Sequence, residues 1–227
     1  MSTMTDGIEV QLRPLEAADG PFLAEMLLEA VNWHPQRPRL SMSGALADPH
    51  LSHYVAGWPC PGEGGVLAVA DQQPIGAAWW RFFTPIDPGY GFVAADVPEL
   101  AMGVVADWRG RGVGRALIRA TMRAAAAHCH RISLSVERAN RAWNLYASEG
   151  FRVLSRGPDS DIMICGLDPV THDHGAESGS RVRGWTAGEE DAAGHGLARF
   201  GEDPGLDGEP GVAQPAGHAV ERPQVDL

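Results

Sequence analysis

Up to residue 167 the chain alternates short apolar runs with longer amphipathic stretches. Runs of roughly four to eight apolar or alternating residues, bounded by glycine and proline, predict β-strands. Longer stretches with apolar side chains three to four positions apart predict helices. The pattern predicts strands at 8–12, 66–70, 75–83, 100–105, 131–137, 151–154 and 161–167, and helices at 15–31, 112–128 and 140–149.

The connections complete this picture. Residues 71–74 join two strands as a hairpin turn. Residues 32–65 are rich in Pro, Gly, Ser and His and predict loops with a short helix, and residues 84–97 form a second Pro/Gly-rich connection. Strands covered by helices predict a mixed α/β (α+β) domain.

The composition changes near residue 168. Residues 171–227 contain 11 Asp and Glu against 4 Arg, a net charge of −7 out of −11 for the chain, and Gly and Pro supply 15 of these 57 residues. Such a segment cannot bury enough apolar surface to offset the entropy lost on ordering. We therefore predict a folded domain over 1–167 and a disordered acidic tail over 168–227.

The charge and cysteine content restrict the class of protein. A net charge of −11 argues against nucleic acid as a partner and favours cationic small substrates. The first residues lack the pattern of a signal peptide, and no apolar run approaches the ~18 residues needed to span a bilayer. Three widely spaced cysteines suit reduced thiols. These features predict a cytoplasmic protein without membrane contact.

The strongest chemical signal is a glycine-rich turn between a buried strand and an amphipathic helix. Its glycines and arginines are Gly110, Gly112 and Gly114, with Arg109, Arg111 and Arg115. Glycines let backbone N–H groups approach an anion, and the helix N-terminus adds the positive end of its dipole. Arginine supplies permanent positive charge. The turn therefore predicts a phosphate or pyrophosphate site.

Several types of phosphate loop have glycines at similar spacing. A Walker loop needs a lysine, and this chain contains none. A dinucleotide fingerprint needs a third glycine at the position of Arg115. A glycine-rich turn that binds no ligand is the remaining alternative.

The turn resembles the Arg/Gln-x-x-Gly-x-Gly/Ala loop of the GNAT superfamily of N-acetyltransferases, with matches at Arg109, Gly112 and Gly114. Residues 140–151 also resemble that family's Asn-x-Ala-x-x-Leu-Tyr-x-x-x-Gly-Phe segment, although Arg141 stands where many members have proline. Asn140 suits a helix N-cap. The resemblance extends over residues 8–167.

The resemblance implies a mostly antiparallel central sheet, flanked by helices, with one splayed parallel pair formed by the strands at 100–105 and 131–136. It also implies acetyl-CoA as the donor, held in this splay. Separately, His50 and His53 lack a third ligand, so no metal is expected. Gly103 marks either a bulge that frees an amide or a site of close packing. The implied donor-binding residues are Met102, Val104, Arg109, Gly110, Arg111, Gly112, Val113, Gly114, Arg115 and Asn140.

The resemblance implies that Tyr146 is the general acid that protonates the departing thiolate. Glu99, at the entry to the donor strand, is the candidate base because an alkylamine must lose a proton before it attacks. The lesser candidates are Asp96, His34 and His53.

An aromatic wall suits a cationic amine through cation–π attraction, and Trp33, Trp80 and Phe82 are the candidates for it. Core packing explains these aromatics equally well. Trp79 and Trp80 point to opposite faces of their strand, so at most one of the two lines the pocket.

The expected function is acetyl transfer from acetyl-CoA to a primary amine of a small molecule or peptide, by direct attack in a ternary complex. The alternative is a domain that binds acyl-CoA without catalysis, as a sensor or interaction module. A homodimer is compatible with either function, and the sequence does not specify the acceptor.

Overall fold

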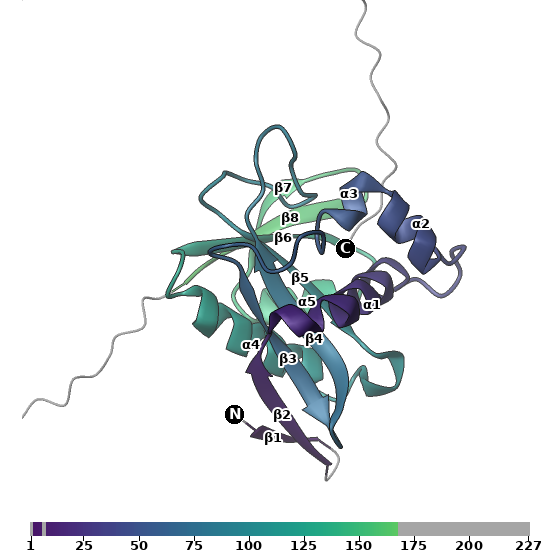
Figure 1. Ribbon diagram of the computed structural model, residues 1–227. Coiled ribbons are helices and arrows are strands. Elements are labelled where there is room, and N and C mark those ends of the chain that lie inside the picture. Colours follow the sequence, from purple (N-terminus) through teal and green to yellow (C-terminus); the bar gives the residue numbers. More distant parts are fainter. Residues whose placement is uncertain (1, 6–7, 168–227) are drawn as a thin grey trace, which may run out of the picture. The chain divides into compact units, whose positions relative to one another are not determined.

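The computed structural model describes residues 2–5 and 8–167 (Figure 1). The predicted tail, 168–227, lies outside these described residues, so its disorder and the domain boundary stay predictions. The strands are β1 (Ser2–Thr5), β2 (Ile8–Pro14), β3 (Gly64–Ala70), β4 (Gln73–Arg81), β5 (Glu99–Val104), β6 (Arg131–Glu137), β7 (Arg152–Arg156) and β8 (Ser160–Gly166). The α-helices are α1 (Gly20–Val31), α2 (Met42–Ala47), α3 (Pro49–Ser52), α4 (Val113–Ala125) and α5 (Ala142–Ser148).

All eight strands form one sheet in the order β1-β2-β3-β4-β5-β6-β8-β7. Every neighbouring pair is antiparallel except β5 and β6, which run parallel and pair at Glu99 with Ser133. Beyond this pair the two strands separate. The mixed fold with one splayed parallel pair confirms the predicted fold class.

The helices cover both faces of the sheet (Figure 1). One core, which we call the α1-face core, joins α1, α2 and α3 to one face through residues such as Leu27, Ala45, Leu51 and Ala101. The other, the α4-face core, joins α4 and α5 to the opposite face through residues such as Leu100, Leu117, Leu134 and Tyr146. Among the described helices, none has the length and apolarity needed to cross a membrane.

The structure adjusts several predicted boundaries. The helix predicted at 15–31 begins at Gly20, because residues 17–19 form a short 3-10 helix held by a reciprocal capping box between Glu16 and Asp19. The hairpin is confirmed, and its turn residues Asp71 and Gln72 have positive φ angles of 47° and 63°. Strand β1 had no sequence signal that we recognised.

The structure decides between the two explanations of Gly103. Strands β4 and β5 pair residue for residue from Gly76–Val104 to Arg81–Glu99, so the β-bulge expectation is wrong. A Cβ at Gly103 would collide with the carbonyl oxygen of Met26 on α1. Gly103 therefore permits the close approach of α1 to β5.

A buried carboxylate at Asp161 connects the end of the sheet to α5. Arg138 Nη1 donates to Asp161 Oδ1 at 2.7 Å, and Trp143 Nε1 donates to Oδ2 at 3.0 Å. Burial acts to raise the pKa of Asp161, but these hydrogen bonds and the charge of Arg156 outweigh it and lower the pKa. The site is therefore a structural connection between β8 and α5.

Asp161→Ala is expected to lower the free energy of unfolding by about 2–3 kcal/mol at pH 7, because the donors of Arg138 and Trp143 lose a charged acceptor. Since the folded-state pKa lies below the unfolded one, this stabilisation is present above about pH 4 and is lost as the pH falls through the folded-state pKa. Urea unfolding from pH 3 to 8 measures both effects. Arg156→Gln is the control, because that guanidinium is mostly exposed and should contribute little.

Candidate active site

Backbone groups of β5 point into the gap between β5 and β6. The Ser133 amide donates to Pro98 O, and the Val105 amide donates to Ile75 O on the β4 side. Backbone groups alternate in direction along a strand, so the amides of Leu100, Met102 and Val104 point toward β6. Because the β5–β6 pairing is confined to Glu99 and Ser133, the amides of Met102 and Val104 lie beyond it and face the gap.

The glycine-rich turn forms an open N-terminus for α4. Gly110 and Gly112 have φ angles of 74° and 86°, in the left-handed region that favours glycine, and a Cβ at either would meet no atom within 4 Å. The first amides of α4, from Val113 to Arg115, have no intrahelical acceptor. Free amides above open space can receive an anion.

Two arginines of the turn form ion pairs with other helices. Arg109 Nε donates to Val104 O at 2.9 Å, and its Nη2 lies 2.5 Å from a Glu29 carboxylate oxygen on α1. Arg115 Nε lies 3.0 Å from a Glu149 carboxylate oxygen. These charges fix the turn to α1 and α5, so the anion-binding capacity rests first on backbone amides.

Two other predicted donor-binding residues, Arg111 and Met102, lie near this turn. The Arg111 guanidinium lies 5.5 Å from the centroid of the Trp108 ring. Met102 Cε lies 3.5 Å from the place that a Cβ on Gly114 would occupy, so the start of α4 lies close to β5. The N-cap residue of α5 is Arg141 rather than the predicted Asn140, but the Asn140 side chain accepts a hydrogen bond from the Ala142 amide at 2.9 Å at the start of this helix.

Glu99 lies at the point where β5 and β6 separate, and its side chain is 1% exposed. Its Oε1 accepts hydrogen bonds from the Tyr54 hydroxyl at 2.7 Å and from the Gly91 amide at 2.8 Å. Its Oε2 has no hydrogen-bond partner among the described residues. The carboxyl therefore has one oxygen held by two donors and one buried oxygen to which none of the described residues donates.

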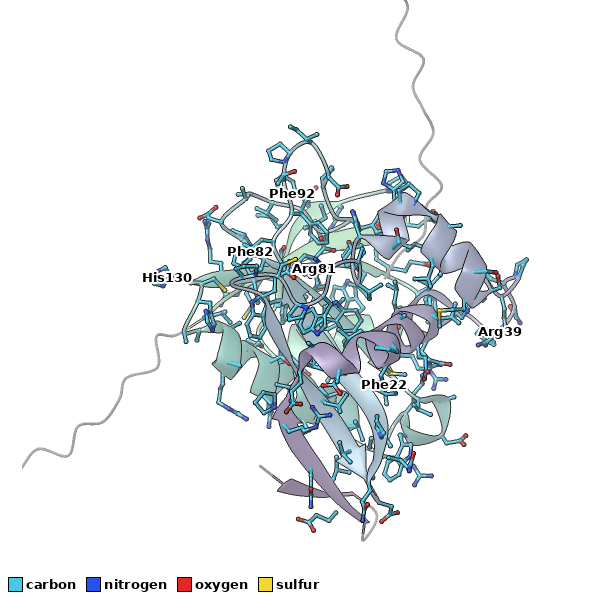
Figure 2. The ribbon with its side chains drawn as sticks, in the orientation of Figure 1. Phe22, Arg39, Arg81, Phe82, Phe92 and His130 are labelled. Atoms are coloured by element: carbon cyan, nitrogen blue, oxygen red, sulfur yellow. The ribbon has the colours of Figure 1, made fainter. Side chains whose placement is uncertain are left out.

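Burial raises the pKa of Glu99 to about 7, against the opposing hydrogen bonds from Tyr54 and Gly91. Arg81 is the cross-strand neighbour of Glu99, but its guanidinium bonds to Glu63 at 3.0 Å. Figure 2 labels Arg81 and Phe82 at the end of β4, below Phe92 in this view. A carboxyl with a pKa near neutrality suits a general base.

Tyr146 and Glu99 face opposite sides of the sheet. Glu99 alternates with Leu100, which belongs to the α4-face core, and it bonds to Tyr54 of the α1-face core. Tyr146 belongs to the α4-face core and contacts the Phe151 ring at 5.7 Å between centroids. Burial raises the pKa of Tyr146. The two groups thus lie on opposite faces of the sheet.

The structure does not bring the three predicted wall aromatics together. Trp80 is 3% exposed and packs in the α4-face core, with its indole N–H bonded to Gly62 O, and Phe82 packs against that same core. This placement corrects the expectation of one shared wall. Trp33 lies apart from both of these residues, and its indole N–H donates to Glu137 Oε1 at 3.2 Å. Arg37 holds the same carboxylate.

The lesser base candidates have different surroundings. His53 Nδ1 lies 2.9 Å from Asp87 Oδ1, and burial lowers the pKa of His53 despite this carboxylate. Asp96 is exposed and lies 3.7 Å from Arg131. His34 Nδ1 accepts a hydrogen bond from the Gln36 amide. Within the described ranges, no three His, Cys, Asp or Glu side chains come together as metal ligands.

A model of the acetyltransferase (GNAT) family matches residues 28–151, which include β5, the glycine-rich turn and α5. The chain belongs to the GNAT acetyltransferase family. Membership supports acetyl transfer as its general activity. No curated protein sequence compared with the chain matches it.

Solved structures show the same fold. The chain is similar to the GNAT domain of PAT from S. lividans, with a TM-score of 0.55, 19% identity, and coverage of 74% of this chain and 96% of that one. A GCN5-related N-acetyltransferase from Kribbella flavida gives 0.52, 26% identity, and coverage of 70% and 98%. The putative acetyltransferase yncA from Salmonella typhimurium, solved with its cofactor acetyl-CoA, gives 0.50, 19% identity, and coverage of 74% and 99%.

Sequence reasoning missed the residues that surround Glu99 from the 32–65 segment. Tyr54 lies three positions after Leu51, and both are fully buried. That spacing could have marked one buried helical face. No local signal links Tyr54 to Glu99, because the contact spans 45 residues.

Proposed function

We propose that this GNAT protein transfers the acetyl group of acetyl-CoA to a primary amine of a small molecule or peptide, by direct attack in a ternary complex. The observation that carries the proposal is the gap between β5 and β6, with Glu99 where it begins on one face of the sheet and the core that contains Tyr146 on the other face. A base on one face and an acid on the other suit addition of an amine to a carbonyl, followed by loss of the thiolate.

The residues have separate roles in this proposal. The amides of Gly112 and of the first turn of α4, up to Arg115, hold the pyrophosphate. The gap-facing amides of Met102 and Val104 hold the acyl arm. Acetyl-CoA supplies the thioester. Glu99 Oε2 receives the proton of the acceptor ammonium, directly or through a water, which leaves a neutral amine to attack. A gap-facing amide stabilises the negative charge that develops on the carbonyl oxygen.

Tyr146 donates its proton to the departing thiolate. The attacking nitrogen releases its second proton to solvent as the amide forms, and solvent returns a proton to Tyr146. A phenol in water has a pKa not far above that of a thiol, whereas burial raises the pKa of Tyr146. Tyr146 is then a weaker acid than expected, and a thiolate leaves well without help. Tyr146→Phe is therefore expected to lower kcat by about 10-fold rather than abolish turnover.

This loss is measured under single-turnover conditions with the most active amine. The control is a thioester with a more acidic thiol, for which the loss should shrink toward zero, because a better leaving group needs less protonation. An equal loss for both thioesters would assign Tyr146 a packing role.

The test of the function is thiol release from acetyl-CoA across a broad panel of primary amines, amino acids and peptide N-termini. We expect release above the enzyme-free background with at least one amine class, with one acetylated product per thiol. Tight acetyl-CoA binding without release over the whole panel would instead support the non-catalytic acyl-CoA-binding module.

A further inference from the structure

Tyr54 connects the segment 32–65 to Glu99. Its side chain is fully buried in the α1-face core, just after α3. The Tyr90 amide donates to the Tyr54 hydroxyl oxygen at 2.7 Å, and the Tyr54 hydroxyl lies 2.7 Å from Glu99 Oε1. One hydroxyl thus lies between a backbone amide and the candidate base.

The direction of these hydrogen bonds follows from their chemistry. A backbone N–H only donates, so the Tyr54 oxygen accepts from Tyr90. Its single proton is then directed to Glu99 Oε1, which also receives the Gly91 N–H. Two donors therefore converge on Oε1, and none of the described residues donates to Oε2.

We propose that Tyr54 is a positioning residue for the transfer reaction. It turns the Glu99 carboxyl so that Oε1 is held and Oε2 takes the proton of the acceptor amine. The inference rests on the proposed function of Glu99 and assigns the basic atom within it. An oxygen that accepts two hydrogen bonds is the less basic of a carboxylate pair, so the proton binds to Oε2.

The loop above the carboxyl is shaped to this arrangement. A Cβ at Gly89 would collide with Glu99 Oε2, and a Cβ at Gly91 would lie 2.9 Å from the Glu99 carboxyl carbon. Only glycine lets the backbone of 89–91 lie against the carboxyl while Gly91 and Tyr90 supply their amides. Loop and base are therefore positioned together by Tyr54.

Other charged and titratable groups near Glu99 are engaged elsewhere. Arg81, on the same face of β4, bonds to Glu63. His53, whose ring centroid lies 4.8 Å from that of Tyr54, bonds to Asp87. Ser133, opposite Glu99 on β6, directs its hydroxyl to Pro98 O. The Tyr54 hydroxyl is therefore the side-chain group with a direct hydrogen bond to Glu99.

The test is a direct titration of the Glu99 carboxyl by carbon NMR on full-length protein, with Glu99→Gln used to assign the signal. The wild-type midpoint is expected near 7. In Tyr54→Phe the midpoint should rise by about one pH unit, because the charged form loses one hydrogen bond. The pKa read from the acid limb of the pH profile of kcat/KM should rise by the same amount.

Thr121→Val is the matched control. It also removes a fully buried hydroxyl, one that donates to Ala78 O, but on α4 away from Glu99. It should leave the Glu99 midpoint unchanged. If Tyr54→Phe does not fold, a second measurement on the wild type replaces it. The carbon NMR signal of the Tyr54 ring carbon that bears the hydroxyl should change with the same midpoint as Glu99, because that hydroxyl donates to the Glu99 carboxylate.

The outcomes separate the two proposals. An unmoved Glu99 midpoint in Tyr54→Phe, or a wild-type Tyr54 signal that does not follow Glu99, overturns this inference and leaves the role of Glu99 standing. Full activity of Glu99→Gln with an unchanged acid limb overturns the role of Glu99, and the assignment of its basic oxygen with it.

Discussion

Gly112→Asp is expected to weaken acetyl-CoA binding at least about 100-fold in calorimetric titration. A Cβ at Gly112 meets no atom within 4 Å, so the new side chain would extend into the open space above the first amides of α4. On our proposal the pyrophosphate occupies that space. A carboxylate there would repel the pyrophosphate and compete for the same amides. Like charges in contact cost several kcal/mol, and every 1.4 kcal/mol raises the Kd about tenfold.

Gly112→Asn is the matched control. Asparagine has nearly the same size as aspartate, and both tolerate the left-handed conformation that Gly112 adopts with φ of 86°. The two variants thus share backbone strain and differ mainly in charge. We expect Asn to retain most of the affinity that Asp loses. Equal losses would show that shape at 112 matters and that no anion lies there, and wild-type protein without affinity for acetyl-CoA would remove the basis of the proposed function.

Glu99→Gln is expected to lower kcat/KM by about 10²–10³-fold at pH 8, with a smaller loss at pH 6. The wild-type rate should rise with pH and level off above about 7, where the Glu99 carboxyl loses its proton. Glutamine keeps an oxygen for the Tyr54 hydroxyl and the Gly91 amide, so the packing is retained, but it cannot accept the proton. The acid limb should therefore disappear in the variant.

Glu99→Gln should lower activity but raise the stability of the folded protein at high pH. Because the folded-state pKa of Glu99 is raised above that of an unfolded glutamate, the folded protein holds a proton that the unfolded chain releases. Wild-type stability should therefore fall as the pH rises from about 4 through about 7. Glu99→Gln should remove this decrease and be the more stable protein at pH 8, which thermal unfolding across this pH range can measure. Lower stability at pH 8 would argue against a buried titrating carboxyl.

Much of the fold follows from the sequence because local pattern and tertiary structure agree. The strand at Arg131–Glu137 has the same bounds in the structure as in the prediction, since apolar Ile132, Leu134 and Val136 alternate with polar residues and all face one core. The glycine-rich turn is equally local, because its positive φ angles at Gly110 and Gly112 depend on residue type.

The parts that sequence reasoning missed depend on long-range partners. The charges of Arg109 and Arg115 predict an anion cradle, but whether they face an anion or a carboxylate depends on Glu29 of α1 and on Glu149, which follows α5. Trp80 suits an aromatic wall or a core equally until its face of the sheet is known. Residues 32–65 lack a regular period, so the contact between Tyr54 and Glu99 had no local signal.

The placement of Glu99 and Tyr146 on opposite faces of the sheet also bears on how products depart. On the proposed roles, the acetylated amine leaves from the α1 side of the sheet. The other product, CoA, extends toward α4. Neither product then blocks the exit of the other, so release needs no fixed order. In product-inhibition kinetics, CoA should compete with acetyl-CoA alone and the acetylated amine with the amine alone.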